Sequence, residues 1–247
     1  MKLRAALIIS LTILVLAIPS TAQRISRGGS SQSGSIRVDL SSERVGREST
    51  KFLAVVGNWS IVGDSSGKKV IGVDGRSWLR GQPAGGLAEK ARSIYGSRNE
   101  EFIDNVKAWA YFPYAVAKDI PDFHDGEIGV WFKVVAGQLD QCAGILFNLK
   151  PNGDYLTVRF NGMEDNVVLW TFNKGVRKFV KKGSENIPLQ KNTWHNLQVS
   201  VHGTSLQAAL DGKHLLDYTL AEPVSGKVGL WSKTDSVVYF NDFTVSR

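Results

Sequence analysis

The sequence predicts an all-β protein, an antiparallel β-sandwich of the jelly-roll kind with a small helical insertion. Apolar and polar residues alternate over residues 126–135 and 142–172, so one face of each strand must lie in a core. Turn signals separate these runs, such as Pro151–Asp154 and the pair Asp211–Gly212, which is typical of a type I′ hairpin. Many short strands joined by regular turns are the pattern of a sandwich or jelly roll.

The N-terminal residues 1–22 have the pattern of a secretory signal. Two basic residues precede a largely apolar run, 5–16, and the small residues Ser20 and Ala22 suit a cleavage site before Gln23. The run is shorter than the roughly 20 residues that span a bilayer, which favours cleavage over the alternative of an uncleaved anchor. We therefore expect a secreted or periplasmic protein with no integral membrane association once the signal is removed.

The rest of the chain is predicted to hold a leader and one folded domain. Residues 23–50 begin with a Ser-, Gly- and Arg-rich stretch without apolar periodicity, so we predict a flexible leader there. The jelly-roll domain then occupies residues 51–247, with the folded body starting near Phe52. The chain has a single cysteine, so no internal disulfide can form and apolar burial must stabilise the domain.

Within this domain, an early pair of strands precedes the insertion and a long β region follows it. Residues 59–62 and 69–73 are predicted to pair across a turn. The insertion at about 83–105 contains two short helical patterns, the first closed by Gly96, and it is too short for a core of its own. Later strands are predicted around 126–134, 143–149, 156–160, 168–172, 197–201, 206–210, 228–230 and 238–245, with an irregular step at Asn241–Asp242.

The chain is moderately basic. Its formal net charge is +7, and loss of the two basic residues of the signal leaves +5. This excess suits attraction to acidic polysaccharide, cell wall or a membrane surface, and it is too small to indicate nucleic-acid binding. Part of it lies in one basic run, 174–182, for which a solvated hairpin is a sufficient explanation. We expect a polysaccharide or another glycan as the partner, and no nucleic acid.

One predicted strand carries a polar face that suits sugar recognition. Tyr155, Arg159 and Asn161 share one parity, opposite the apolar residues of the same strand. Aromatic rings, guanidinium groups and amides are the groups that bind sugars. The alternative is structural: Arg159 pairs with Glu164, and Asn161 with Asn166, to fix a tight hairpin. The candidate ligand-binding residues of this face are Tyr155, Arg159, Asn161, Glu164, Asn166 and, on the preceding strand, Asn148.

A second candidate face lies on the strand at 126–134. Glu127 and Trp131 have the non-core parity there, and Trp131 suits a platform for sugar stacking. The alternative is that the helical insertion covers Trp131. Two further tryptophans, Trp194 and Trp231, lie at strand ends and are predicted to be packing residues, because large aromatic side chains dominate burial in sandwiches.

The segment 155–169, YLTVRFNGMEDNVVL, resembles the Y-x-x-x-R-x-N-x-x-E-x-N-x-x-L stretch of secreted bacterial concanavalin A-like jelly-roll proteins. These proteins belong to the LamG-like and 3-keto-disaccharide-hydrolase-like group. The resemblance covers residues 126–245, and more weakly 52–73. It implies the concanavalin A-like fold, and it offers a glycoside hydrolase as one candidate activity, although one fold hosts many functions. Other segments similar to the same group are 194–199 (WHNLQV), 210–213 (LDGK) and 226–237.

The sequence gives little support for catalysis. Glucanases of this fold resemble one another in an E-x-D-x-x-E strand, and this chain contains no E-x-D. Glycoside hydrolysis needs two carboxylates about 5–5.5 Å or 6.5–9.5 Å apart, whereas Glu164 and Asp165 are adjacent and point apart on an extended chain. We therefore predict a non-catalytic carbohydrate-binding or surface-interaction module and assign no catalytic residue. The alternatives are a glycoside hydrolase of the 3-keto-disaccharide type and a structural envelope protein.

No cofactor is predicted, and structural calcium is the one metal that the sequence leaves open. Related jelly rolls hold calcium with loop aspartates, for which Asp122, Asp125 and Asp242 are available. No loop has the ordered acidic repeat of a dedicated calcium site, and the four histidines lack the spacing of metal ligands. Cys142 begins a strand and is predicted to be a packed side chain rather than a nucleophile.

Overall fold

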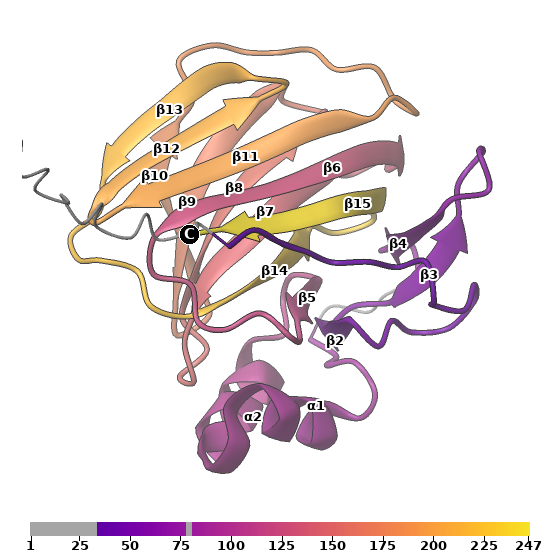
Figure 1. The fold of residues 1–247 in the computed structure, drawn as a ribbon, viewed down its shortest axis with the longest axis vertical. Coiled ribbons are helices and arrows are strands. Elements are labelled where there is room, and N and C mark those ends of the chain that lie inside the picture. The colour runs from indigo at the N-terminus through magenta and orange to yellow at the C-terminus, as the bar shows by residue number, and fades with distance from the viewer. Residues whose placement is uncertain (1–33, 78–80) are drawn as a thin grey trace, which may run out of the picture. The chain divides into compact units, whose positions relative to one another are not determined.

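The computed structural model describes residues 34–77 and 81–247, which form two antiparallel β-sheets packed as a sandwich (Figure 1). The predicted all-β jelly roll with a small helical insertion is thereby confirmed. The predicted export signal, residues 1–22, lies outside the described residues. Within the described ranges, no helix is long and apolar enough to cross a membrane.

The first sheet, sheet A, is formed by strands from both ends of the domain. Its long central strands β6 and β15 pair along most of their length, with a shift in register between Asn241 and Thr244. That shift confirms the irregular step predicted near Asp242. In spatial order the strands are β13 (Lys213–Thr219), β12 (Ser205–Leu210), β11 (His195–His202), β6 (Gly126–Ala136), β15 (Val237–Ser246), β4 (Lys69–Asp74) and β3 (Trp59–Gly63), and β1 (Ile36–Arg37) also pairs with β15.

The second sheet, sheet B, contains the strand on which the polar candidates were predicted. That strand, β8, lies between β7 and β9, so both of its edges are hydrogen-bonded. The edge strand beside β9 is β10, which carries the basic run. In spatial order the strands are β10 (Val176–Lys182), β9 (Asn166–Asn173), β8 (Tyr155–Asn161), β7 (Cys142–Leu149), β14 (Lys227–Ser232), β5 (Tyr114–Ala117) and β2 (Phe52–Val56).

The main core lies between the two sheets, where the inward residues of each strand meet. Val130 and Phe132 of β6 face inward from sheet A, and Val158 and Phe160 of β8 face inward from sheet B. The rings of Phe132 and Phe160 stack across the interface with centroids 5.7 Å apart. The alternation in the sequence therefore assigned these residues to the core correctly, because side-chain direction alternates strictly along a strand.

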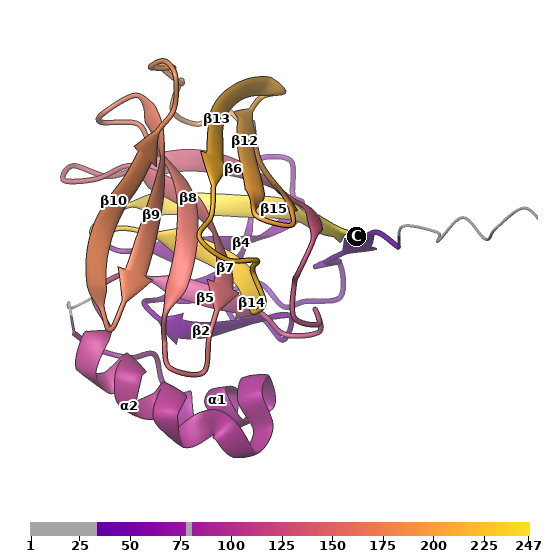
Figure 2. The same ribbon diagram turned by 90° about the vertical axis from the view of Figure 1, so that its left-hand side faces the viewer.

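The helical insertion forms α1 (Leu87–Tyr95), a 3₁₀ turn (Gly96–Arg98) and α2 (Asn99–Trp109). Both views place these helices beside β2 and β5, at one end of sheet B (Figures 1 and 2). The apolar side chains of α1 and α2 recur every third or fourth residue and so form one stripe on each helix. That stripe builds a second core on the outer face of sheet B, which contains Leu87, Ala91, Ile94, Phe102, Val106, Tyr114, Tyr155, Phe172 and Trp231.

The folded body begins earlier than the predicted start near Phe52. Ile36 and Arg37 pair with β15, and Leu40 is buried in the main core. Glu43 is also buried, and its carboxylate accepts the backbone N–H of Thr50 at 3.0 Å. The prediction of a flexible leader up to residue 50 is therefore wrong for its last part. Single buried residues such as Leu40 and Glu43 hold this segment to the domain, and they show no apolar periodicity from which a strand could have been predicted.

Candidate functional site

Four of the predicted residues lie together at the β8–β9 turn; we call them the Arg159 cluster: Arg159, Asn161, Glu164 and Asn166. The Arg159 guanidinium donates to the Asn166 backbone carbonyl at 3.2 Å, to the Asn166 side-chain oxygen and to Glu164 Oε2 at 2.8 Å. The Asn166 amide also donates to Glu164 Oε2 at 3.1 Å. These contacts tie β8 to β9 across their connecting turn.

Asn161 extends the network toward the neighbouring loops. Its side-chain oxygen accepts the Met163 backbone N–H at 2.9 Å, and its amide donates to Asp140 at 3.4 Å. The buried Asp140 carboxylate also accepts from Lys233 Nζ and from Thr234 Oγ1, each at 2.8 Å. The network therefore joins the β8–β9 turn to the segments before β7 and after β14.

Burial leaves the Arg159 cluster little capacity for a ligand. Arg159 is 3% exposed and Asn161 is 1% exposed, whereas the Glu164 side chain retains 47%. Burial alone would raise the pKa of Glu164, but the charge of Arg159 and hydrogen bonds from Arg159 and Asn166 hold that pKa below its ordinary value. The Arg159–Glu164 pair is the one expected in the structural interpretation, and both terminal nitrogens of the guanidinium already donate to partners within the cluster.

Tyr155 lies on the same face of β8 as Arg159, at the helical end of the strand. Its ring stacks on Phe172 with centroids 4.2 Å apart, and its hydroxyl accepts Trp231 Nε1–H at 3.3 Å. Burial raises the pKa of Tyr155 above its ordinary value. The helices cover this part of the outer face, so Tyr155 keeps only 8% of its surface. Trp231 is fully buried, which confirms its predicted packing role.

Two further candidates, Glu127 and Trp131, lie on β6 in sheet A and are therefore remote from β8 in topology. Trp131 is 42% exposed, and the Glu127 carboxylate accepts only from Gln198 Nε2 at 3.1 Å among the described residues. The suggestion that the helical insertion covers Trp131 is wrong, because both helices pack on sheet B. The predicted residues thus belong to two separate surfaces.

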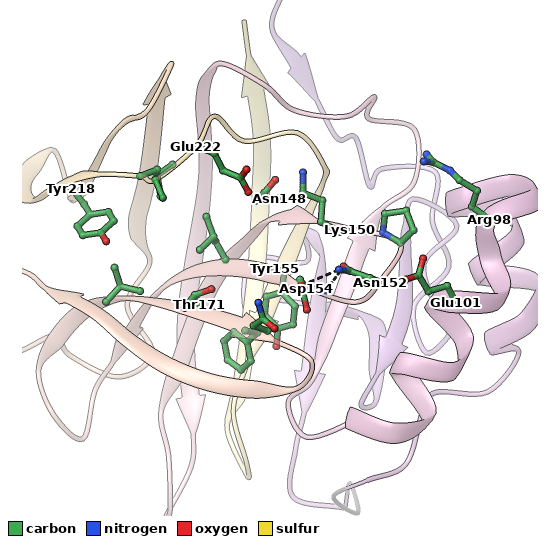
Figure 3. A pocket seen from close by; sticks show the side chains of 17 residues that line it. Arg98, Glu101, Asn148, Lys150, Asn152, Asp154, Tyr155, Thr171, Tyr218 and Glu222 are labelled. Atoms are coloured by element: carbon green, nitrogen blue, oxygen red, sulfur yellow. Dashed lines mark hydrogen bonds between the residues drawn. The ribbon is translucent and has the colours of Figure 1, made fainter.

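A groove of about 650 Å³ lies where the helices, sheet B and the β13–β14 connection meet; we call it the end groove (Figure 3). Figure 3 shows Arg98 and Glu101 on the helical side and Tyr218 and Glu222 on the opposite side. Two predicted residues, Tyr155 and Asn148, line it. The labelled lining residues are Arg98, Glu101, Asn148, Lys150, Asn152, Asp154, Tyr155, Thr171, Tyr218 and Glu222.

Asn148 is held in the groove wall by an unusual backbone conformation. Its φ is 55°, a left-handed value that asparagine tolerates better than most residues, and the pairing of β7 with β14 shifts register nearby. The side-chain oxygen accepts the Ser225 backbone N–H at 2.8 Å. Its amide nitrogen donates to no described residue, so it is available for a hydroxyl group in the groove.

Three carboxylates line the end groove. Both oxygens of Asp154 are engaged, by the Asn152 amide at 3.0 Å and by the Lys174 backbone N–H at 2.7 Å. Glu101 and Glu222 are exposed, and within the described part of the chain neither carboxylate accepts a hydrogen bond or an ion pair. The carboxylates of Glu101 and Glu222 are therefore acceptors, and the Asn148 amide a donor, that a ligand in the groove could use.

Sequence reasoning missed most of this groove. Glu101 belongs to the helical insertion, whereas Tyr218 and Glu222 belong to β13 and to the connection after it, more than 100 residues later in the chain. The helical stripe does place Glu101 outside the apolar face of α2. No local pattern, however, relates that helix to β13, so no signal in the sequence could have joined these residues.

The aspartates considered for calcium lie apart and are each engaged. Asp122 pairs with Lys227 at 2.8 Å, and Asp125 accepts the Gly203 backbone N–H at 2.9 Å. Asp242 pairs with Arg37 and with Lys68. No group of three or more His, Cys, Asp or Glu in the described ranges is arranged to hold a metal ion.

Cys142 is fully buried at the start of β7. Burial raises the pKa of its thiol to about 12, so the thiol stays protonated at neutral pH. The prediction of a packed, unreactive side chain is consistent with this position.

Solved structures that share the fold include a carbohydrate-binding module and a transglycosylase. The carbohydrate-binding module CBM66 from Bacillus subtilis matches with a TM-score of 0.56 and 14% identity, over 80% of this chain and 96% of its own. The apo Crh5 transglycosylase matches with a TM-score of 0.51 and 11% identity, over 86% of this chain and 84% of its own. No protein-family model matches the sequence, and no curated protein is significantly similar to it. The fold is a jelly-roll β-sandwich, and at these identities the likeness extends to the fold alone.

Proposed function

We propose that this protein is an exported, non-catalytic module that binds a glycan in the end groove. The observation that carries the proposal is the groove itself, about 650 Å³ in volume, with aromatic side chains beside amide and carboxylate groups. Sugars are bound by such combinations, because a ring face contacts aromatic surface while the hydroxyl groups need planar hydrogen-bonding partners. The module from Bacillus subtilis named above supports the proposal by analogy of fold.

The groove receives the ligand in this proposal, and the Arg159 cluster supports the hairpin behind it. Glu101 and Glu222 accept hydrogen bonds from sugar hydroxyls. The side-chain amide of Asn148 donates a hydrogen bond to a sugar hydroxyl. Tyr218 lies on the side of the groove opposite Glu101 and offers a partly exposed ring. The stacked rings of Tyr155 and Phe172 form the floor of the groove.

The first experiment is a polysaccharide retention assay with wild type, Glu101→Gln and Glu222→Gln. Each substitution removes a charged acceptor, so we expect affinity to fall by about fivefold to tenfold. Glu100→Gln is the matched control, because Glu100 lies on the same helix, is exposed and does not line the groove. Equal losses in Glu100→Gln and Glu101→Gln would contradict a site in the groove. Retention of no glycan by any variant would favour the structural envelope protein.

A glycoside hydrolase remains the second candidate, because carboxylates from three separate segments line one groove. General acid and base catalysis at a glycosidic bond needs two of them, and Asp154 is already engaged at both oxygens. This alternative agrees with the resemblance to the 3-keto-disaccharide-hydrolase-like group. Release of reducing ends by wild type, lost in Glu222→Gln while retention persists, would replace the non-catalytic proposal with this one.

A further inference from the structure

The edge strand β10 and the turn before it carry a concentration of positive charge. Residues 174–182 include five basic side chains and no acidic one. Six of the seven residues of β10 are exposed, and none of its basic groups forms an ion pair with a described carboxylate. A solvated hairpin explains exposed lysines, but it does not explain how Arg177 is held.

Arg177 is positioned on the outer face of sheet B by aromatic rings. It pairs in register with Phe172, so it shares that residue's face. Its guanidinium lies 4.3 Å from the ring centroid of Trp170 and 5.3 Å from that of Phe112. Contact with rings orients a guanidinium without neutralising it, so its N–H groups stay available for an oxyanion.

A hollow of about 410 Å³ opens beside Arg177; we call it the Arg177 hollow. Arg76 and Lys233 also line it, but each is paired, Arg76 with Asp74 at 2.6 Å and Lys233 with Asp140 at 2.8 Å. The carboxylate that lines the hollow, that of Asp235, accepts hydrogen bonds from the three backbone N–H groups of residues 138–140 at 2.7–3.1 Å. Arg177 is thus the one cation lining the hollow, among the described residues, that has no carboxylate partner.

We propose that the Arg177 hollow is a subsite for the anionic group of an acidic polysaccharide, either a carboxylate or a sulfate ester. The planar fork of Arg177 matches such a group, and Phe112 and Tyr111 in the same wall provide ring surface for the sugar that bears it. The four lysines of 174–182 raise the local concentration of a polyanion along the strand. The inference rests on the proposed glycan-binding function and adds the class of glycan.

The test is affinity electrophoresis of the purified protein through polygalacturonate, dextran sulfate and neutral dextran. We expect wild type to be retarded by at least one acidic polymer, and Arg177→Gln to lose about tenfold in affinity for it. Arg177→Lys keeps the charge without the planar fork and should fall in between. Lys178→Gln is the matched control, since it makes the same change of charge on the next exposed residue of β10, which alternation turns to the opposite face. That control should stay within about twofold of wild type.

Several outcomes would overturn the subsite. Equal losses in Arg177→Gln and Lys178→Gln would show diffuse attraction to the strand. Retention by neutral dextran alone, unchanged in Arg177→Gln, would remove the acidic preference and leave the proposed function standing. Arg177-dependent binding to phosphatidylglycerol vesicles, with no retardation by either acidic polymer, would assign the hollow to a membrane surface. Failure to bind any polysaccharide would remove both the subsite and the proposed function.

Discussion

Arg159 and Arg177 lie on the same face of sheet B and both approach the ring of Trp170, yet their surroundings are opposite. Arg159 is 3% exposed and donates to a carboxylate, an amide oxygen and a backbone carbonyl. Arg177 is exposed on an edge strand, where its guanidinium lies against the rings of Trp170 and Phe112 and forms no ion pair with a described residue. A buried charge without partners is costly, so Arg159 must be neutralised within the fold. Arg177 remains solvated and can exchange water for a ligand.

The largest effect that separates the two arginines should be on stability. Arg159→Ala leaves the Asn166 carbonyl and side-chain oxygen without their donor and opens a cavity, so we expect a loss of about 2 kcal/mol in unfolding free energy. The value is below that for a fully buried pair, because Glu164 remains solvated after the substitution. Urea denaturation measures it, with Lys178→Ala as the surface control. A loss no larger than the control's would mean that the cluster does not stabilise the hairpin.

A smaller effect should appear in the dependence of stability on pH. The pKa of Glu164 is lower in the folded protein than its ordinary value of 4.5, so its contribution is present above that value and is lost as pH falls through the folded pKa. Glu164→Gln has no such contribution. The stability difference between wild type and Glu164→Gln should therefore be constant near neutral pH and shrink below about pH 4.5. A difference that stays constant down to pH 3 would contradict the assigned ion pair.

The smallest effect is expected for Arg177 on stability. Arg177→Gln removes ring contacts but no hydrogen bond or ion pair within the described residues, so the unfolding free energy should change by no more than about 1 kcal/mol. Thermal and urea unfolding, run beside the binding assay, measure this change. A loss comparable to that of Arg159→Ala would make Arg177 a second structural residue, and the contrast between the two arginines would disappear.

The alternation of residues predicted which face each candidate occupies, but not whether that face is open. Tyr155 and Arg159 do lie opposite the main core, as their parity requires. Their low exposure arises from α1 and α2 at one end of β8 and from the β8–β9 turn at the other. A strand pattern describes the direction of a side chain and contains no information about what a distant segment places over it.

The end groove illustrates the same limit on a larger scale. Asn148 and Tyr155 were found because both have the non-core parity of neighbouring strands. Glu101, Tyr218 and Glu222 join them only because the helical insertion and the β13–β14 connection converge on the same end of sheet B. The basic run on β10 was visible in the sequence as charge, whereas the rings that orient Arg177 come from β9 and from the segment before β5.

By itself, the sequence determined the β-sandwich, the inward and outward residues of its strands and the type I′ turn, in which Asp211 and Gly212 both have positive φ. These features depend on alternation and on local backbone preferences, which act over a few residues. The tertiary structure decided which polar residues are enclosed in a hydrogen-bonded network and which line a groove. That outcome depends on the packing of segments far apart in the chain, because burial, and with it the need for a partner, is a property of the assembled fold.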